Sequence, residues 1–388
     1  MHNDDTDALL RLITAGGAAA PRKALLERHG SATAALAAGA TAWRASGLSD
    51  AQVHALRRPD AAKLEAARHW CTDARHHLLG WNDADYPSLL RRSPNAPLAL
   101  FVAGDPALLW HPAIAIVGSR AATPGGRDNA AVFARCFVAS GFAVVSGLAA
   151  GVDAAAHQAA LEASGATVAV LGTGPDVPYP RAHADLHARI AATGAIVSEH
   201  LPGTGARTEH FPSRNRILAG LALGTVVIEA AERSGALITA RLAAEAGREV
   251  FAVPGSIHNP LARGCHRLIR DGAALVETAR EVIAALAPAA QELAADLRIR
   301  LDSPTSPAGA AAAADPGPDE GPEGSQTDPP RQDGDHQKLW KALGHDPTDM
   351  DQLVTRTGLT PAELSSMLLL MELDGRVTVQ HGRYHRSR

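Results

Sequence analysis

The feature that most constrains the fold is the alternation of short apolar runs with longer helical stretches between residues 112 and 286. The apolar runs have the length of buried strands, and the stretches between them have helical periodicity. Such alternation predicts an α/β fold built on a Rossmann-like, doubly wound parallel sheet. The predicted strands are residues 113–117, 142–145, 167–171, 195–197, 225–228, 249–253 and 273–276.

The chain on either side of this region has other patterns. Residues 1–70 combine helical periodicity with glycine-containing turns, which predicts a small helical domain of the SAM or helix-hairpin-helix type. DNA binding, packing and partner docking are all compatible with such a domain. Residues 71–111 are rich in proline and tryptophan, and we interpret them as a connector leading into the core.

The end of the chain predicts a linker and one more domain. Residues 287–335 have the composition of a disordered acidic linker. Residues 336–388 show three helical segments followed by a hairpin pattern, which predicts a winged helix. The third helix opens at residues 360–363 with the sequence TPAE, which is typical of a capping box. This domain is compatible with DNA binding and with protein binding.

Charge and composition limit the classes of function. The formal net charge is −4, but residues 301–335 hold eight acids and one base, so the rest of the chain is close to +3. A nucleic-acid site would therefore be a local cluster of cations and not a basic face. The three cysteines are far apart, which predicts neither a disulfide framework nor a metal site. An acidic start and the lack of a membrane-length apolar run predict a cytoplasmic protein.

Loops of small residues follow four of the predicted strands. In an open parallel sheet, ligands bind beyond the carboxyl ends of the strands, where helix N-termini present free N–H groups. Glycine and serine let a phosphate approach the backbone, and arginine side chains at the same edge suit phosphate. We therefore expect a nucleic-acid site there. Its candidate residues are Gly118, Ser119, Arg120, Ser146, Gly147, Tyr179, Arg181, Arg214, Asn215, Arg216, Ser234 and Gly235.

Three of the side chains near this edge have alternative roles. Arg216 is equally compatible with an ion pair to Glu229 or Glu232 inside the fold. Tyr179 and Phe211 are the aromatic residues close to this edge, and each is suited either to stacking on a base or to packing in the core.

Enzymatic motifs are incomplete. Residues 172–177 begin like a dinucleotide-binding fingerprint but lack its third glycine, so no nucleotide cofactor is expected. The central region contains no lysine for a phosphate-gripping loop or a Schiff base. His157 and His183 are isolated and predicted to be surface or capping residues, and Asp153 is predicted to cap the helix that follows it. We expect neither a catalytic residue nor a metal.

Several long motifs together resemble the DNA-processing protein A family, also called DprA or Smf. They read IVGSR at residues 116–120, VSGLA at 145–149, GVDAAAH at 151–157, AVLGTG at 169–174, FPSRNRI at 211–217 and RSGALIT at 233–239. They occur in the family's order and cover roughly residues 80–286. The helical start and the winged-helix end fit the longer members.

This resemblance implies a homodimeric protein that binds single-stranded DNA, recruits the RecA recombinase and loads it during natural transformation. Carried over to this sequence, Gly118, Ser119 and Arg120 would contact phosphate, and Arg181 would provide a second cation where many members have lysine. The segment from Arg214 to Arg216 would support the same pocket. Ala184 stands where some members have an aromatic residue that stacks on a base.

Two other functions remain open at this stage. One is an enzyme of the same broad fold, such as a nucleotide phosphoribohydrolase, although the PGGxGT motif of that class is not found at residues 223–229. The other is a protein-interaction scaffold that uses its end domains for binding and its sheet for dimerisation.

Overall fold

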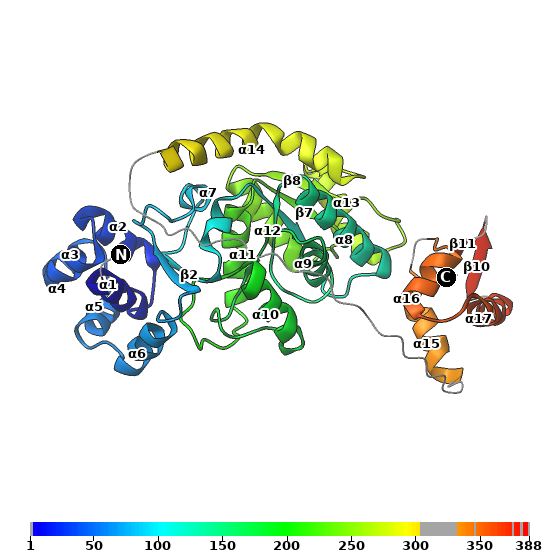
Figure 1. Cartoon of the computed structure of the whole chain (residues 1–388), viewed down its shortest axis with the longest axis horizontal. Coiled ribbons are helices and arrows are strands. Elements are labelled where there is room, and N and C mark those ends of the chain that lie inside the picture. Colours follow the sequence, from blue (N-terminus) through cyan, green and yellow to red (C-terminus); the bar gives the residue numbers. More distant parts are fainter. Residues whose placement is uncertain (1–2, 303–331, 345–346, 375, 381–382, 387–388) are drawn as a thin grey trace, which may run out of the picture. The chain divides into compact units, whose positions relative to one another are not determined.

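The structure is a computed structural model that describes residues 3–302, 332–344, 347–374, 376–380 and 383–386. The chain divides into two compact units, Met1–Ala294 and Ala295–Arg388. The first contains the large sheet, and the second contains the C-terminal helices and hairpin (Figure 1).

The first unit is organised around a nine-stranded sheet with the order β1-β2-β6-β5-β4-β3-β7-β8-β9. All neighbours from β6 to β9 are parallel, whereas β1 pairs with β2, and β2 with β6, in the antiparallel sense. The predicted α/β fold is therefore confirmed, and each predicted strand lies within one residue of an observed one at both ends. The strands are β1 His76–Gly80, β2 Ala99–Gly104, β3 Ala113–Val117, β4 Ala143–Ser146, β5 Thr167–Val170, β6 Ala195–Ser198, β7 Gly224–Val227, β8 Glu249–Ala252 and β9 Ala274–Leu275.

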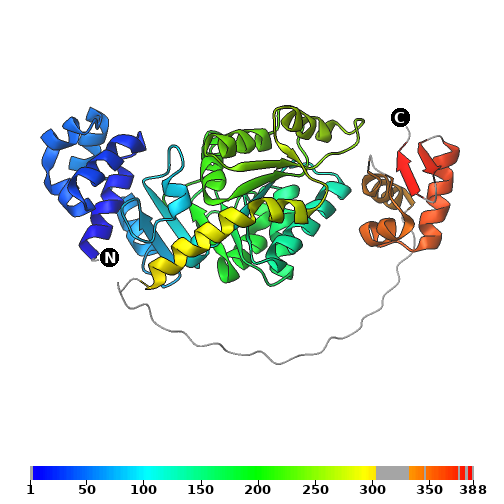
Figure 2. The ribbon, with the colours of Figure 1, turned by 90° about the horizontal axis from the view of Figure 1, so that it is seen from above.

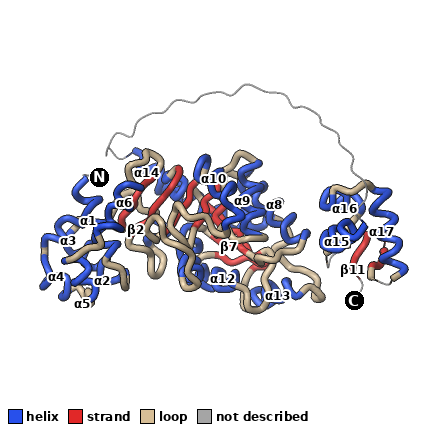
Figure 3. Tube along the Cα trace, turned by 90° about the horizontal axis from the view of Figure 1, so that it is seen from below, coloured by secondary structure: helices blue, strands red, loops and turns tan. Residues whose placement is uncertain are grey.

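Helices cover both faces of the sheet, as Figure 3 shows for the red strands between blue helices. Successive residues of a strand point to opposite faces. In β3, Ala113, Ala115 and Val117 belong to a core shared with α11 and α12, whereas Ile114 and Ile116 pack with α8, α9 and α14. The helices are α7 Ser88–Arg91, α8 Pro124–Ala139, α9 Val152–Glu162, α10 Ala184–Thr193, α11 His210–Leu221, α12 Gly235–Glu245, α13 Arg263–Arg270 and α14 Ala279–Asp302, with 3-10 turns η1 Pro106–Trp110, η2 Arg181–His183 and η3 Pro260–Ala262.

The segment 71–111 is part of the sheet, and its prediction as a connector is wrong. It supplies β1 and β2, and every residue of β2 is buried. The strands were not recognised from the sequence because proline and tryptophan residues lie in the turns on either side of them. Trp81, which follows β1, packs edge-on against Tyr86 at 5.4 Å between ring centroids.

The N-terminal helices pack against this antiparallel edge of the sheet (Figure 2). Leu10, Leu64 and Trp70 share a core with Phe101 of β2 and Ile196 of β6. The predicted helical domain is therefore present but belongs to the same compact unit as the sheet. Its helices are α1 Asn3–Thr14, α2 Ala19–His29, α3 Ala32–Ala37, α4 Gly39–Ala45, α5 Asp50–Arg57 and α6 Ala61–Trp70.

Helix α14 corrects the predicted start of the linker. We placed that start at residue 287, but the helix continues to Asp302 and buries Leu286 and Leu293 against the sheet-side core. Residues 303–331 of the predicted linker lie outside the described residues. Within the described part of the chain, no helix is both long and apolar enough to cross a membrane.

The C-terminal module consists of three helices and a two-stranded hairpin, as predicted for a winged helix. Leu339, Leu353, Leu364 and Leu368 form its core. Thr360 and Glu363 make the predicted capping box at the start of the third helix. The elements are α15 Gln332–Ala342, α16 Met350–Thr357, α17 Pro361–Leu373, β10 Val377–Gln380 and β11 Arg383–Arg386.

Candidate functional site

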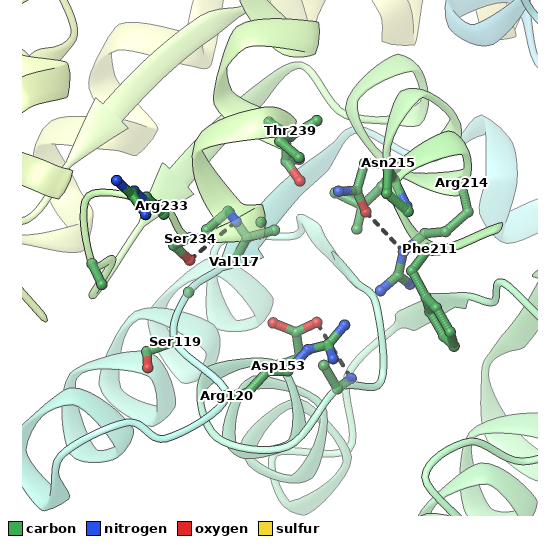
Figure 4. A pocket seen from close by; sticks show the side chains of 18 of the residues that line it. Val117, Ser119, Arg120, Asp153, Phe211, Arg214, Asn215, Arg233, Ser234 and Thr239 are labelled. Carbon is green, nitrogen blue, oxygen red and sulfur yellow. Dashed lines mark hydrogen bonds between the residues drawn. The ribbon is translucent and has the colours of Figure 1, made fainter. Parts of the chain in front are cut away.

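A cavity of about 510 Å³ lies at the carboxyl edge of the sheet, where the strand order reverses. After β3 the chain adds β4, β5 and β6 on one side and then returns to place β7 on the other. Such a reversal leaves a crevice between the loops that follow the two central strands. Figure 4 shows side chains from both loops and from α11 and α12 around this space. Its lining includes Gly118, Ser119, Arg120, Asp153, Phe211, Arg214, Asn215, Arg233, Ser234, Gly235 and Thr239.

Two exposed arginines stand on the rim of the cavity. Arg120 follows β3, and Arg233 lies in the loop between β7 and α12. Among the described residues, neither guanidinium group has an ion-pair partner, although Arg120 lies 5.7 Å from the ring centroid of Phe211. Cations that the fold does not neutralise are available for a negatively charged ligand.

Helix α12 points its N-terminus at the same cavity. Ser234 caps the helix by accepting a hydrogen bond from the backbone N–H of Ala236 at 3.3 Å. Gly235 leaves open space where a side chain would stand. The free N–H groups and dipole of a helix N-terminus favour an anion beside Arg233.

Three buried polar side chains face the interior of the cavity. Asn215 is 9% exposed, and its Oδ1 accepts from Arg214 Nε at 2.9 Å, which leaves its amide nitrogen without a hydrogen bond among the described residues. Thr239 is 2% exposed, and its hydroxyl has no partner within that same part of the chain. Asp153, 5% exposed, uses only Oδ2, which accepts from the N–H groups of Gly147 and Ala149. The interior can therefore donate and accept hydrogen bonds.

Asp153 does not cap its helix, which corrects our prediction. Gly151 holds the N-cap position of α9, and no side chain caps it. The carboxylate instead reaches back to the loop after β4 and fixes the backbone there. Burial raises its pKa, while the nearby Arg214 guanidinium acts in the opposite direction.

Arg214 is buried in the wall of the cavity and hydrogen-bonded to the backbone. Its Nη1 donates to the carbonyl oxygens of Gly147, at 2.8 Å, and Val170. A Cβ on Gly147 would collide with the guanidinium group, so this close approach requires glycine. Burial lowers the pKa of Arg214 to about 10, with Asp153 favouring the charged form. Arg214 thus holds the loops after β4 and β5 in place.

Ser146 and two histidines also lie inside the fold. Ser146 is fully buried and donates to the carbonyl of Ile116 at 2.6 Å. His157, predicted to lie at the surface, is fully buried, and its Nδ1 lies 2.7 Å from Thr167 Oγ1. His183 is half-buried beside the carbonyl of Leu148, at 2.9 Å. Their packing could not be predicted because it depends on how separate elements come together in the fold.

Arg216 is not among the residues that line the cavity. Its Nη2 lies 2.5 Å from Glu199 Oε2, so the alternative of an ion pair inside the fold holds, but with Glu199 in place of Glu229 or Glu232. Glu229 instead accepts from the backbone and hydroxyl of Thr123 and from Asn259. These contacts tie the end of β7 to the start of α8.

Tyr179 and Arg181 do not line the cavity. The Tyr179 ring is 41% exposed and packs 5.0 Å from the ring of Phe211, which does line it. Arg181 is exposed at the start of η2. Both side chains are accessible to a ligand that extends beyond the cavity.

Several residues that line the cavity were outside the predicted set, among them Asp153, Arg233 and Thr239. Phe211 was recognised only as an aromatic residue close to this edge. The sequence did indicate Arg233, because this residue directly precedes Ser234 and Gly235, which were both predicted to bind nucleic acid. Thr239 gave no such signal, since it enters the cavity from the second turn of α12.

Known proteins resemble this chain in sequence and in fold. Residues 77–287 match the family described as DNA recombination-mediator protein A, and residues 323–383 match the DprA winged helix domain. Protein Smf of Escherichia coli (strain K12) is 36% identical over 328 residues, which cover 84% of this chain and 81% of the relative.

Two solved structures are also similar. DNA processing protein A (DprA) from Streptococcus pneumoniae has a TM-score of 0.64 and 37% identity, over 71% of this chain and 95% of that one. DNA processing protein A from Helicobacter pylori, whose structure concerns its unique single-stranded DNA binding mode, has a TM-score of 0.50 and 27% identity, over 55% of this chain and 96% of that one.

Proposed function

The chain belongs to the DNA recombination-mediator protein A family, and from this premise we propose that it binds single-stranded DNA at the cavity and presents the strand to a recombinase of the RecA type. It does so without reading sequence strictly and without catalysing a reaction. We place its action in the cytoplasm, where DNA taken up by the cell would meet the recombinase.

The observation that carries this proposal is the separation of charge and polarity across the cavity. Arg120, Arg233 and the N-terminus of α12 offer positive charge at the rim. The interior offers the apolar side chains of Val117, Leu218 and Ile238 together with hydrogen-bonding groups. A nucleotide matches both parts of the cavity. Its charged phosphate suits the rim, and its flat base, which is apolar on both faces and polar at the edge, suits the interior.

This division also favours a single strand over a duplex. The hydrogen-bonding edges of the bases are occupied and stacked away in a duplex, whereas an unpaired nucleotide can turn its base into a cavity. The exposed Tyr179 and Arg181 then lie where neighbouring nucleotides would contact the surface. Stacking on an aromatic ring tolerates every base, which fits binding without sequence preference.

A homodimer would strengthen this binding. Two cavities on one strand turn the second contact into an intramolecular event, so the effective local concentration raises the overall affinity. Within one protomer, only a few nucleotides would be held.

The test is fluorescence anisotropy of labelled single-stranded and duplex oligonucleotides across a salt series. We expect a clear preference for the single strand, and an affinity that falls with salt because phosphate neutralisation releases counterions. Equal or absent binding would contradict the proposal.

Incubation with nucleoside monophosphates distinguishes the rival hydrolase function, since release of free base would favour an enzyme. RecA loading is then measured as faster filament formation on coated single strands, and no acceleration would refute that part of the proposal.

A further inference from the structure

The winged-helix module carries a helix whose chemistry does not suit DNA. In DNA-binding modules of this kind, the last helix before the hairpin enters the major groove and meets phosphates on both sides. Here that helix is α17, and its sequence contains glutamates but no lysine, arginine or histidine. A helix of this charge is repelled by DNA.

Three arginines of the module make contacts within the module itself. The guanidinium groups of Arg376 and Arg386 lie over the ring of Trp340, at 4.5 and 4.4 Å from its centroid. Arg386 also donates to the carbonyl of Trp340. Arg356 donates to the carbonyl of Ala342 at 3.2 Å. These three cations therefore stabilise the fold of the module, although Arg376 also stays exposed, as does Arg383 on β11.

One side of α17 has a regular pattern of its own. Glu363, Met367, Leu370 and Asp374 are spaced by four, three and four residues, which places them in one line along the helix. We call this line the α17 stripe. Its centre is apolar, with Leu370 53% exposed and Met367 half-buried, and a carboxylate stands at each end. The buried core side of the helix is formed by Leu364, Leu368 and Met371, and Met367 packs partly against this core, so Leu370 is the exposed apolar residue of the stripe.

We propose that the α17 stripe is a docking surface for an amphipathic helix of a protein partner, whose apolar side is flanked by lysines or arginines. Amphipathic helices commonly bind through anchors at this spacing, and methionine and leucine adapt well to apolar partner surfaces. The terminal carboxylates would pair with the partner's cations and set its direction along the helix. Hydrogen bonds from Thr360 lower the pKa of Glu363, so that this end of the stripe keeps its negative charge.

The probe for this proposal is a labelled synthetic amphipathic peptide with a leucine stripe flanked by lysines, titrated into the full-length protein by anisotropy. A peptide of the same composition in scrambled order is the first control. We expect the ordered peptide to bind more tightly than the scrambled one. Leu370→Ser should weaken binding of the ordered peptide about tenfold, because it removes the apolar anchor. Asp374→Asn should weaken this binding less and should reduce its salt dependence.

Val132→Ser is the matched control variant, because Val132 on α8 is also 53% exposed. It should leave peptide binding unchanged. Equal binding of the two peptides, or equal losses in the Leu370 and Val132 variants, would overturn the proposal.

A parallel titration with duplex and single-stranded oligonucleotides tests whether the partner of the α17 stripe is DNA and not a protein. We expect Leu370→Ser and Asp374→Asn to leave both unchanged. If these substitutions alter duplex binding while the ordered peptide fails to bind, α17 is a DNA-reading helix and the proposal is wrong. Circular dichroism of each variant confirms that α17 is still folded.

Discussion

The rim of the cavity and the winged-helix module both carry arginines, but they differ in what surrounds each guanidinium group. Arg120 and Arg233 are exposed on loops and, among the described residues, have no ion-pair partner. Arg376 and Arg386 both lie over the indole ring of Trp340. The same residue type therefore provides a binding surface in one region and internal packing in the other.

Arg214 extends this comparison to the wall of the cavity, where an arginine is fully enclosed. Its position beside the carbonyls of Gly147 and Val170 and near Asp153 makes it a support for the loops that form the site. Substitutions at these three kinds of arginine should therefore have different consequences for stability and for binding.

The largest effect is expected for Arg214→Met. Removing a buried cation leaves two carbonyl oxygens and a nearby carboxylate without compensation, which should lower the free energy of unfolding by about 3 kcal/mol. Chemical denaturation measures this change, and Arg214→Lys should restore part of the stability. Because Arg214 is buried and donates to backbone carbonyls, we expect the salt dependence of the remaining DNA binding to stay the same. An unchanged free energy of unfolding would show that the hydrogen bonds of Arg214 to the two carbonyl oxygens do not stabilise the fold.

The second effect concerns the free arginines. Replacing Arg120 and Arg233 together by glutamate should weaken single-stranded DNA binding about 100-fold, since each change removes a phosphate contact and adds repulsion. Arg135→Glu on α8, another exposed arginine, is the control and should have little effect. Anisotropy measures the affinity, and thermal melting should show intact folding. If affinity survives, the site lies elsewhere.

A third prediction tests the buried His157 beneath the site. Burial lowers its pKa to about 3, below its ordinary value of 6.5, so the folded protein holds it neutral. The unfolded chain therefore binds more protons below pH 6.5, and stability is lost as the pH falls from this value. Between pH 7 and pH 5 the loss from this group should be about 2 kcal/mol.

Denaturation of the wild type and of His157→Gln at the two pH values measures this effect. The variant should show a smaller decrease, because glutamine does not titrate and can still reach Thr167. Equal pH dependence in both proteins would assign the loss to other groups.

The smallest effect is expected in the winged-helix module. Replacing Arg376 and Arg386 by glutamine should destabilise this module by about 1 kcal/mol for each lost contact with Trp340. Hydrogen exchange resolved along the chain would locate the change in α15 and the hairpin. Single-stranded DNA affinity should change less than about twofold, because these contacts serve packing. A larger loss would show that these arginines also bind DNA.

Much of the fold could be predicted from local patterns. The strands from β3 to β9 were recognisable because they are short apolar runs between helical stretches, and α17 because its capping box is contained within four consecutive residues. The antiparallel strands β1 and β2 were missed, since turns rich in proline and tryptophan surround them. The course of α14 beyond residue 287 was missed because alanine-rich and proline-containing sequence also suits a linker.

The sequence by itself determined the order of strands and helices, the small residues of the loops and the edge of the sheet at which those loops meet. These properties follow from periodicity and from the direction of parallel strands. Only the tertiary structure decided which arginines remain free. Arg120 and Arg216 look alike in the sequence, but Glu199, seventeen positions before Arg216, lies beside it in the fold and neutralises it. Such pairing depends on distances between separate elements, and those distances exist only once the chain has folded.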